Sequence, residues 1–234
     1  MSVVARSLSV FDAFADGAPS LRLTDIAGRT GLPVPTTLRL VRELVAWGGL
    51  ERQGDGSYRV GTRLWSLGTR APCPRRLRDA AAGPLAALHA ETGHASHAVV
   101  ADGAGAVVVG ERGGLVADGS VLPWHASAAG LVLLAYAREE LRADVMTASV
   151  RLTAHTVVAP GLLAARLARV RSGEVAVTRE EWRRGQTEAA VAIPGPDGRA
   201  VGAIGLAART TIGRAAVAAL RRAATAAGEA LARH

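Results

Sequence analysis

Residues 21–61, LRLTDIAGRTGLPVPTTLRLVRELVAWGGLERQGDGSYRVG, decide the fold of the first part of the chain. The segment 23–33 predicts a short helix that Thr24 caps and that ends in a left-handed turn at Gly31. A second helix follows, with Pro35 in its first turn, where a missing N–H costs nothing. Residues 50–60 form two strand-like runs around Asp55-Gly56, a strong hairpin signal. Helix, turn, helix and hairpin together predict a winged helix-turn-helix.

The second helix has two distinct faces. Apolar residues at steps of three and four predict a buried stripe of Leu40, Val41, Leu44 and Trp47. We expect the opposite face to present hydroxyl and guanidinium groups, which suit phosphate oxygens and guanine edges in a major groove. The wing should touch the DNA backbone or minor groove. The residues predicted to bind double-stranded DNA are Thr36, Thr37, Arg39, Arg42, Arg52 and Arg59. The alternative is a surface helical hairpin with solvated arginines.

Composition supports this prediction without deciding it. A length of 234 residues allows one large or two modest domains. A net charge of +8 favours a polyanionic partner, and all 28 basic residues are arginine. However, residues 1–70 hold nine arginines against six acidic residues, so the excess is not concentrated in the predicted DNA-binding segment.

Other sequence features argue against a secreted or membrane protein. The longest apolar run, residues 126–137, is too short to span a bilayer. Arg6 and Asp12 interrupt the N-terminal segment, which lacks the layout of a signal peptide. A single cysteine, Cys73, cannot form an internal disulfide, which fits a reducing cytoplasm. We therefore expect a cytoplasmic protein with no membrane partner.

The rest of the chain predicts an α+β domain. Ala71-Pro72-Cys73-Pro74 breaks the chain, and a helical pattern follows to Thr92. Beyond His97, apolar runs of strand type form a hairpin at 98–101 and 106–109 and recur at 175–177, 189–193 and 201–207. Helical runs cover 127–136, 160–170 and 213–233. Hairpin strands flanked by helices indicate an antiparallel sheet. The expected divisions are 1–70, 71–92 and 93–234.

Five stretches in this order and spacing resemble the IclR family of bacterial transcriptional regulators over essentially the whole chain. They are residues 24–33 (TDIAGRTGLP), 54–61 (GDGSYRVG), 84–93 (PLAALHAETG), 122–130 (LPWHASAAG) and 198–204 (GRAVGAI). The resemblance implies an N-terminal winged helix, a linker helix that pairs subunits, and a C-terminal GAF-like domain that binds a small-molecule effector. It also implies homodimers or dimers of dimers on palindromic operators.

Some positions depart from the family pattern. Leu131 follows Gly130 where a lysine is frequent, and Gly185-Gln186-Thr187-Glu188 stands where many members have a Gly-x-Arg-Cys-type strand. Gly205 and Ala207 replace two alternating serines, while Val34 and Pro35 replace a common Lys-Ser pair. If these strand positions line the pocket, it has lost hydroxyl donors and gained a carboxylate. The small organic acids inferred for better-known relatives should therefore not be carried over.

The resemblance places the effector site at the start of the helix 127–136. Its predicted residues are Trp124, His125, Ala126, Ser127 and Gly130, faced by Glu188, Gly205 and Ala207 from strands. A helix N-terminus offers unpaired N–H groups to an anionic or carbonyl group. Glu188, if it points inward, should need an amine, a hydroxyl or Arg112 as partner. The alternative is that Trp124 belongs to the core and Glu188 faces solvent.

Two further alternatives concern assembly and chemistry. The stripe Leu77, Ala81, Leu85 and Leu88 could pair two subunits, or could be buried against its own domain. His94 and His97, with His125, Asp102 and Glu188 elsewhere, are the candidates for a metal-binding or catalytic GAF-like protein. No nucleophile elbow or phosphate loop accompanies them. We expect no catalytic residues, no metal and no cofactor.

Overall fold

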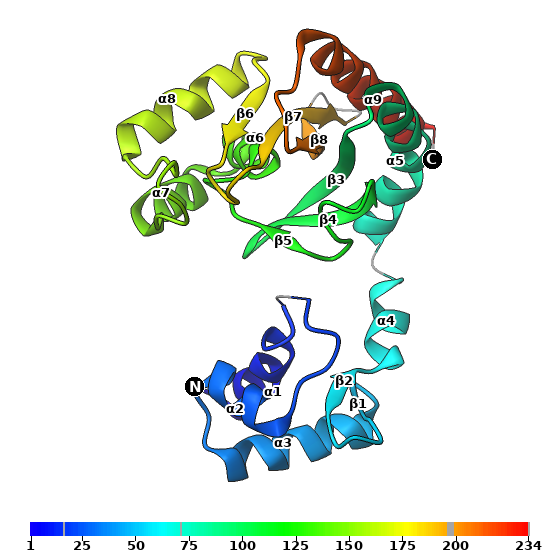
Figure 1. The fold of residues 1–234 in the computed structure, drawn as a ribbon, viewed down its shortest axis with the longest axis vertical. Coiled ribbons are helices and arrows are strands. Elements are labelled where there is room, and N and C mark those ends of the chain that lie inside the picture. Colours follow the sequence, from blue (N-terminus) through cyan, green and yellow to red (C-terminus); the bar gives the residue numbers. More distant parts are fainter. Residues whose placement is uncertain (16, 71, 196–198, 234) are drawn as a thin grey trace. The chain divides into compact units, whose positions relative to one another are not determined.

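The structure, a computed structural model, describes residues 1–15, 17–70, 72–195 and 199–233. The chain divides into two units, Met1–Pro72 and Cys73–His234 (Figure 1). Ala71, where the sequence predicts the start of the linker helix, lies outside the described residues. No helix in these ranges is both long and apolar enough to cross a membrane.

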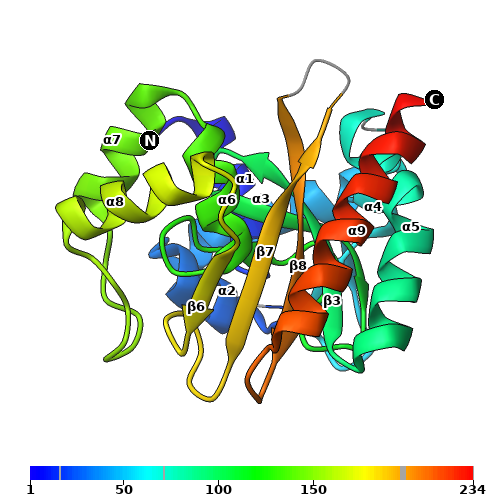
Figure 2. The same ribbon diagram turned by 90° about the horizontal axis from the view of Figure 1, so that it is seen from above.

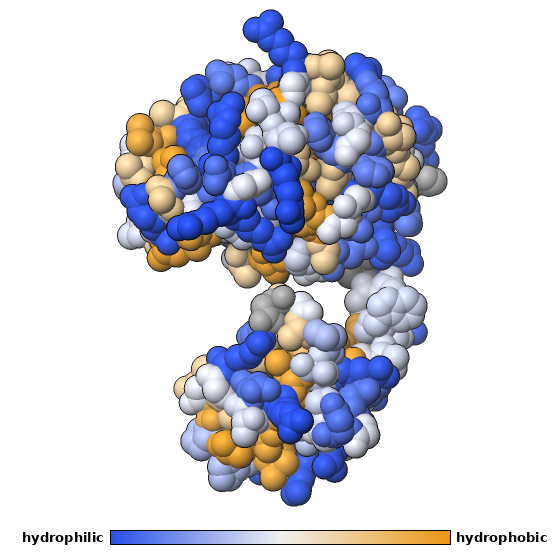
Figure 3. Space-filling view, viewed as in Figure 1, coloured by the Kyte–Doolittle hydropathy of each residue, from blue (hydrophilic) through white to orange (hydrophobic). Residues whose placement is uncertain are grey.

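The N-terminal unit is a winged helix-turn-helix, as predicted. Its elements are α1 (Val3–Asp12), α2 (Leu23–Thr30), α3 (Val34–Trp47), β1 (Leu50–Arg52), β2 (Tyr58–Val60) and α4 (Thr62–Gly68). The antiparallel pair β1–β2 forms the wing. A core that includes Val10, Ile26, Val41 and Leu50 holds the three helices and the wing together. Hydrophobic patches remain on the face of this unit drawn in Figure 3.

Local chemistry in this unit differs from the sequence prediction at three points. Thr24 does not cap α2, because the helix begins earlier and Asp25 Oδ2 accepts a hydrogen bond from the backbone nitrogen of Arg22 at 3.1 Å. Gly31 adopts the predicted left-handed conformation, with φ 68°. Trp47 is exposed, so it does not complete the buried stripe of α3. In the wing only Gly56 has positive φ, and Asp55 instead accepts hydrogen bonds from Ser57.

The C-terminal unit is the predicted antiparallel α+β domain. Its strands are β3 (Ala95–Asp102), β4 (Gly105–Arg112), β5 (Val121–Leu122), β6 (Ala176–Arg179), β7 (Thr187–Pro194) and β8 (Ala200–Ala208). They form one sheet in the order β5-β4-β3-β8-β7-β6 with antiparallel neighbours. Its helices are α5 (Pro72–Thr92), α6 (Ala128–Tyr136), α7 (Glu139–Ala148), α8 (Pro160–Arg171) and α9 (Arg214–Ala232).

Helices cover both faces of this sheet. Figure 2 shows α5 and α9 side by side over one face and α6 behind the other, with α7 and α8 beyond it. Residues Leu77, Ala81, Leu85 and Leu88 of α5 are buried against the sheet and α9 of their own unit. The prediction that this stripe pairs two subunits is therefore wrong, and its alternative is correct. Alternation along the strands sends every second side chain toward α6, where the candidate effector site lies.

Candidate functional site

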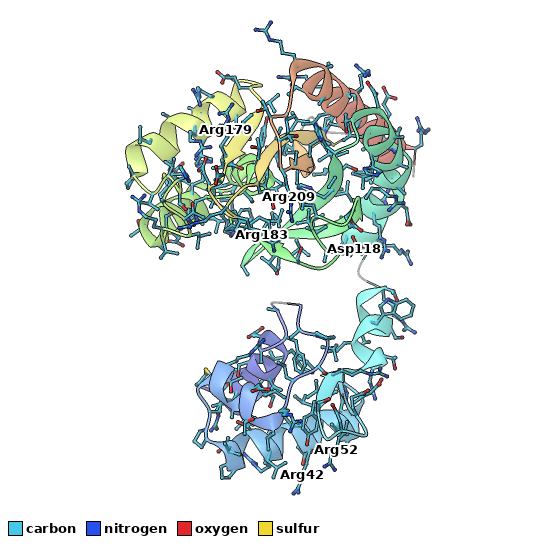
Figure 4. The ribbon with its side chains drawn as sticks, viewed as in Figure 1. Arg42, Arg52, Asp118, Arg179, Arg183 and Arg209 are labelled. Atoms are coloured by element: carbon cyan, nitrogen blue, oxygen red, sulfur yellow. The ribbon has the colours of Figure 1, made fainter. Side chains whose placement is uncertain are left out.

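The outer face of α3 carries the arginines expected to read DNA. Arg39 and Arg42 are exposed, and Thr36 is half-buried in the first turn. Arg42 and Arg52 project from the N-terminal unit in Figure 4. Thr37 is different: it is fully buried, and its Oγ1 donates to the Pro33 carbonyl at 3.1 Å. The expectation that Thr37 projects from the helix is wrong, because its hydroxyl satisfies the backbone instead.

The two wing arginines are not equivalent. Arg52 is exposed and points away from the unit (Figure 4). Arg59 donates to Glu51 Oε2 from Nε at 2.9 Å and from Nη2 at 2.7 Å. The Arg59 hydrogen bonds, followed by one from the backbone of Thr62, lower the pKa of Glu51. The charge of Arg59 is thus already paired within the wing.

The start of α6 is built from the predicted residues 124–130. Ser127 caps the helix: its Oγ accepts from the Gly130 nitrogen at 3.0 Å and donates to the Pro123 carbonyl at 2.7 Å. A Cβ at position 130 would lie 2.3 Å from the Pro123 oxygen, so this position requires glycine. His125 Nε2 donates to the Val150 carbonyl at 2.8 Å, and Ala126 is fully buried.

Glu188 points inward and lies against the start of α6. Glu188 is 2% exposed, so the alternative of a solvent-facing Glu188 is wrong. Its Oε2 accepts from the Ala128 nitrogen at 2.9 Å and from Thr178 Oγ1 at 3.3 Å, and its Oε1 accepts from Gln186 Nε2 at 2.7 Å. Arg112, the partner that the sequence suggested, instead donates to the Glu111 carbonyl.

The surroundings of Glu188 have opposing effects on its pKa. Burial raises its pKa, and the hydrogen bonds from Ala128, Gln186 and Thr178 and the charge of Arg183 oppose that rise. Arg183 itself stacks on the Trp182 ring at 4.0 Å. The carboxylate is therefore held by neutral donors and one more distant positive charge, with no guanidinium or ammonium group bonded to it in the described part of the chain.

Two buried polar side chains on this side of the sheet lack a partner among the described residues. They are His97, through both ring nitrogens, and Trp124, through Nε1. His97 is 1% exposed, and burial lowers its pKa to about 4, so its ring is neutral. The ring lies over Gly205, where a Cβ would sit 2.6 Å from His97 Nε2. A buried, unsatisfied donor is costly unless a ligand or water pairs with it.

His97 was missing from the predicted effector residues. The sequence did contain a signal for it, because His97 is an ionisable residue among the small and apolar residues of segment 95–101 of β3. Its cross-strand partner Gly205 comes from more than one hundred positions later, and only the sheet register shows that glycine makes room for the ring.

Register places the site residues in two adjacent rows on one face of the sheet. Thr178, Glu188, Ala207 and Ala95 form the first row, and Ala190, Gly205, His97 and Glu111 form the second. Most of these side chains are small, and α6 covers them. Beside them a pocket of about 620 Å³ opens between α6, α8 and β6. Three residues that line this pocket, Leu131, Val170 and Ala176, belong to the same buried cluster as Trp124.

The histidines do not form a metal centre within the ranges that the structure describes. No group of three or more His, Cys, Asp or Glu side chains there could hold an ion. The His94 carbonyl accepts a hydrogen bond from His89 Nδ1 at 2.8 Å, and His125 is hydrogen-bonded to the Val150 carbonyl. His97 and Glu188 lie in adjacent rows of one sheet face, and Trp124 belongs to the buried cluster that includes Ala190 and Ala207.

A winged helix-turn-helix joined to a sensory-type α+β domain defines a class of DNA-binding transcriptional regulators. Residues 3–54 match the IclR helix-turn-helix domain, and residues 74–233 match the bacterial transcriptional regulator IclR C-terminal domain. The chain belongs to the IclR family.

Individual relatives agree with this assignment. The HTH-type transcriptional regulator XynR of Escherichia coli (strain K12) is 30% identical over 221 residues, which cover 89% of this chain and 86% of XynR. An IclR homologue from Microbacterium hydrocarbonoxydans, solved in complex with 4-hydroxybenzoate, has a TM-score of 0.85 at 28% identity over all of both chains. A putative IclR transcriptional regulator from Silicibacter sp. TM1040 has a TM-score of 0.84 at 26% identity, covering 99% of this chain and 95% of that one.

Proposed function

We propose that this protein controls transcription in the cytoplasm by binding a palindromic operator with α3 and the wing. Thr36, Arg39 and Arg42 would contact the major groove, and Arg52 and Arg59 the backbone or minor groove. The observation that carries the proposal is the exposure of Arg39 and Arg42 on the outer face of α3, whose opposite face is buried in the unit. Guanidinium groups in this position can donate two hydrogen bonds to a guanine edge.

Symmetric operators require two DNA-binding units, so we propose a homodimer or a dimer of dimers. The stripe of α5 is buried and cannot serve as the pairing face. The first helix offers a better surface, since Val3, Val4 and Leu8 of α1 are each more than half exposed at 54%, 68% and 57%. Pairing through α1 would remove these apolar side chains from water.

We also propose that a small effector binds between α6 and the sheet. The relative bound to 4-hydroxybenzoate supports a ligand of roughly that size. The site would comprise the predicted residues Trp124, His125, Ala126, Ser127, Gly130, Glu188, Gly205 and Ala207, together with His97. The unpartnered nitrogens of His97 and Trp124 support this location. Such a ligand regulates DNA binding only if its affinity differs between DNA-bound and free protein.

Selection of bound sequences from a random duplex library, followed by footprinting, tests this function. We expect one palindromic consensus for the wild-type protein. Arg39→Ala should reduce the difference in binding free energy between that consensus and random DNA by roughly 1–3 kcal/mol, which is what one contact to a base edge contributes. Arg70→Ala, which removes an exposed arginine outside α3 and the wing, is the matched control. An unchanged preference in Arg39→Ala would contradict the assignment of α3 as the reading helix.

A further inference from the structure

The N-terminus of α6 is already occupied by a carboxylate of the chain itself. A helix of this length attracts anions at its first turn through its free N–H groups. Glu188 Oε2 takes the Ala128 N–H at 2.9 Å, and the Ser127 hydroxyl takes the Gly130 N–H at 3.0 Å. Two of the N–H groups that would otherwise bind an anionic ligand at this end of the site are therefore used internally.

Glu188 nevertheless retains hydrogen-bonding capacity. A carboxylate accepts about four hydrogen bonds, two at each oxygen. Oε2 has two donors, Ala128 N and Thr178 Oγ1, whereas Oε1 has one, Gln186 Nε2. Oε1 can thus accept one more hydrogen bond from a ligand.

The other unpartnered polar atoms define what the rest of a ligand must offer. Trp124 Nε1 can only donate, so it requires an acceptor. His97 is neutral, so one ring nitrogen donates and the other accepts. The small residues Gly205, Ala207 and Ala190 lie beside His97 and Glu188 on the sheet face. Neither Trp124, neutral His97 nor Glu188 carries a positive charge.

From this arrangement, and resting on the proposed effector site, we propose that the effector carries an uncharged hydrogen-bond donor, such as an amide or hydroxyl, where it meets Glu188, and no carboxylate there. A ligand carboxylate would compete with Glu188 for the same N–H group. It would also bring a second negative charge into a buried space, which is strongly unfavourable. Glu188 therefore excludes organic acids as well as recognising a donor.

Two ligands of the same shape and different charge test this inference. Isothermal titration of the full-length protein with 4-hydroxybenzamide and with 4-hydroxybenzoate should give an affinity at least about ten-fold higher for the amide. In Glu188→Ala the Ala128 N–H becomes free, and binding of 4-hydroxybenzoate should strengthen at least about ten-fold over wild type. Glu188→Gln keeps an acceptor for Ala128 without the charge, so it should also bind the acid more tightly than wild type.

The same titrations include a control variant and have outcomes that would contradict the proposal. Glu140→Ala removes an exposed carboxylate of α7 and should leave both affinities at their wild-type values. Wild-type protein that binds the acid more tightly than the amide would overturn the proposal. The proposal would also be overturned if Glu188→Ala and Glu188→Gln gained no affinity for the acid while circular dichroism showed both proteins to be folded. Absence of any selected operator would instead count against the proposed function, because the ligand titrations do not involve DNA.

Discussion

Glu188 Oε2 lies 2.9 Å from the backbone nitrogen of Ala128 and joins strand β7 to the first turn of α6. The two residues are 60 positions apart in the chain. This contact fixes a buried carboxylate against the first turn of the helix. Because this carboxylate is held by neutral donors, we expect the proposed site to be sensitive both to ligand charge and to pH.

Replacing Glu188 with glutamine should change how stability depends on pH. Burial raises the pKa of Glu188 above its ordinary value of 4.5 in the folded protein. As pH rises above 4.5, the unfolded chain loses this proton first, so the folded state is progressively disfavoured until the raised pKa is passed. The free energy of unfolding of wild type relative to Glu188→Gln should therefore fall with rising pH in this window. Urea unfolding of both proteins across pH 4–8 measures it, and a constant difference would contradict the assignment.

His97 should have the opposite effect. Its pKa falls from 6.5 to about 4 on burial, so below pH 6.5 the unfolded chain takes up a proton that the folded protein does not. At ~1.4 kcal/mol for each pKa unit, lowering the pH from 7 to 5 should cost about 2 kcal/mol of stability through this residue. His97→Gln should lack this loss in urea unfolding, whereas His155→Gln, at an exposed position, should retain it. Equal losses in His97→Gln and wild type would contradict a buried neutral ring.

The sequence predicts much of the fold because the relevant information is local. Short apolar runs identify the strands, and Ser127 followed by a fully apolar run identifies α6. Two elements escaped prediction: β5 has only two residues, too few for a pattern, and α7 has a mixed polar sequence without a buried residue. The Thr24 cap failed because the helix begins before that residue.

The site was less predictable because its contacts are long-range. Glu188 and Ala128 are brought together by packing of α6 on β7, which no local pattern encodes. The role of Gly205 depends on the register that places it opposite His97. Thr37 illustrates a different limit, since it lies three and four positions before Leu40 and Val41 and so shares their buried face of α3, where its hydroxyl donates to the Pro33 carbonyl.

Substitution at two adjacent threonines should separate stability from DNA recognition. Thr37→Val removes a fully buried hydroxyl that donates to Pro33, and we expect a loss of about 1 kcal/mol in the free energy of unfolding. Its operator preference should be unchanged. Thr36→Val should show the reverse, with weaker operator binding and near wild-type stability. Denaturant unfolding and operator titration of both proteins check this, and a loss of sequence preference in Thr37→Val alone would contradict it.

Arg52 and Arg59 of the wing should contribute unequally to DNA binding. Arg52 is exposed and free to approach a phosphate, whereas Arg59 donates two hydrogen bonds to Glu51. Each neutralised phosphate contributes about 0.9 to the slope of log affinity against log salt. Arg52→Ala should therefore reduce that slope by about 0.9, and Arg59→Ala by clearly less.

The paired state of Arg59 can itself be tested with Glu51→Gln, which removes the opposing charge while leaving the guanidinium in place. We expect Glu51→Gln to bind operator and random duplex more tightly, with a steeper salt dependence than wild type. In the Glu51→Gln background, Arg59→Ala should then lower the slope as much as Arg52→Ala does in wild type. Fluorescence anisotropy between 50 and 200 mM salt is sufficient, a range over which phosphate contacts change affinity by large factors. If Arg59→Ala lowers the slope as strongly as Arg52→Ala with Glu51 intact, the ion pair does not restrain Arg59 on DNA.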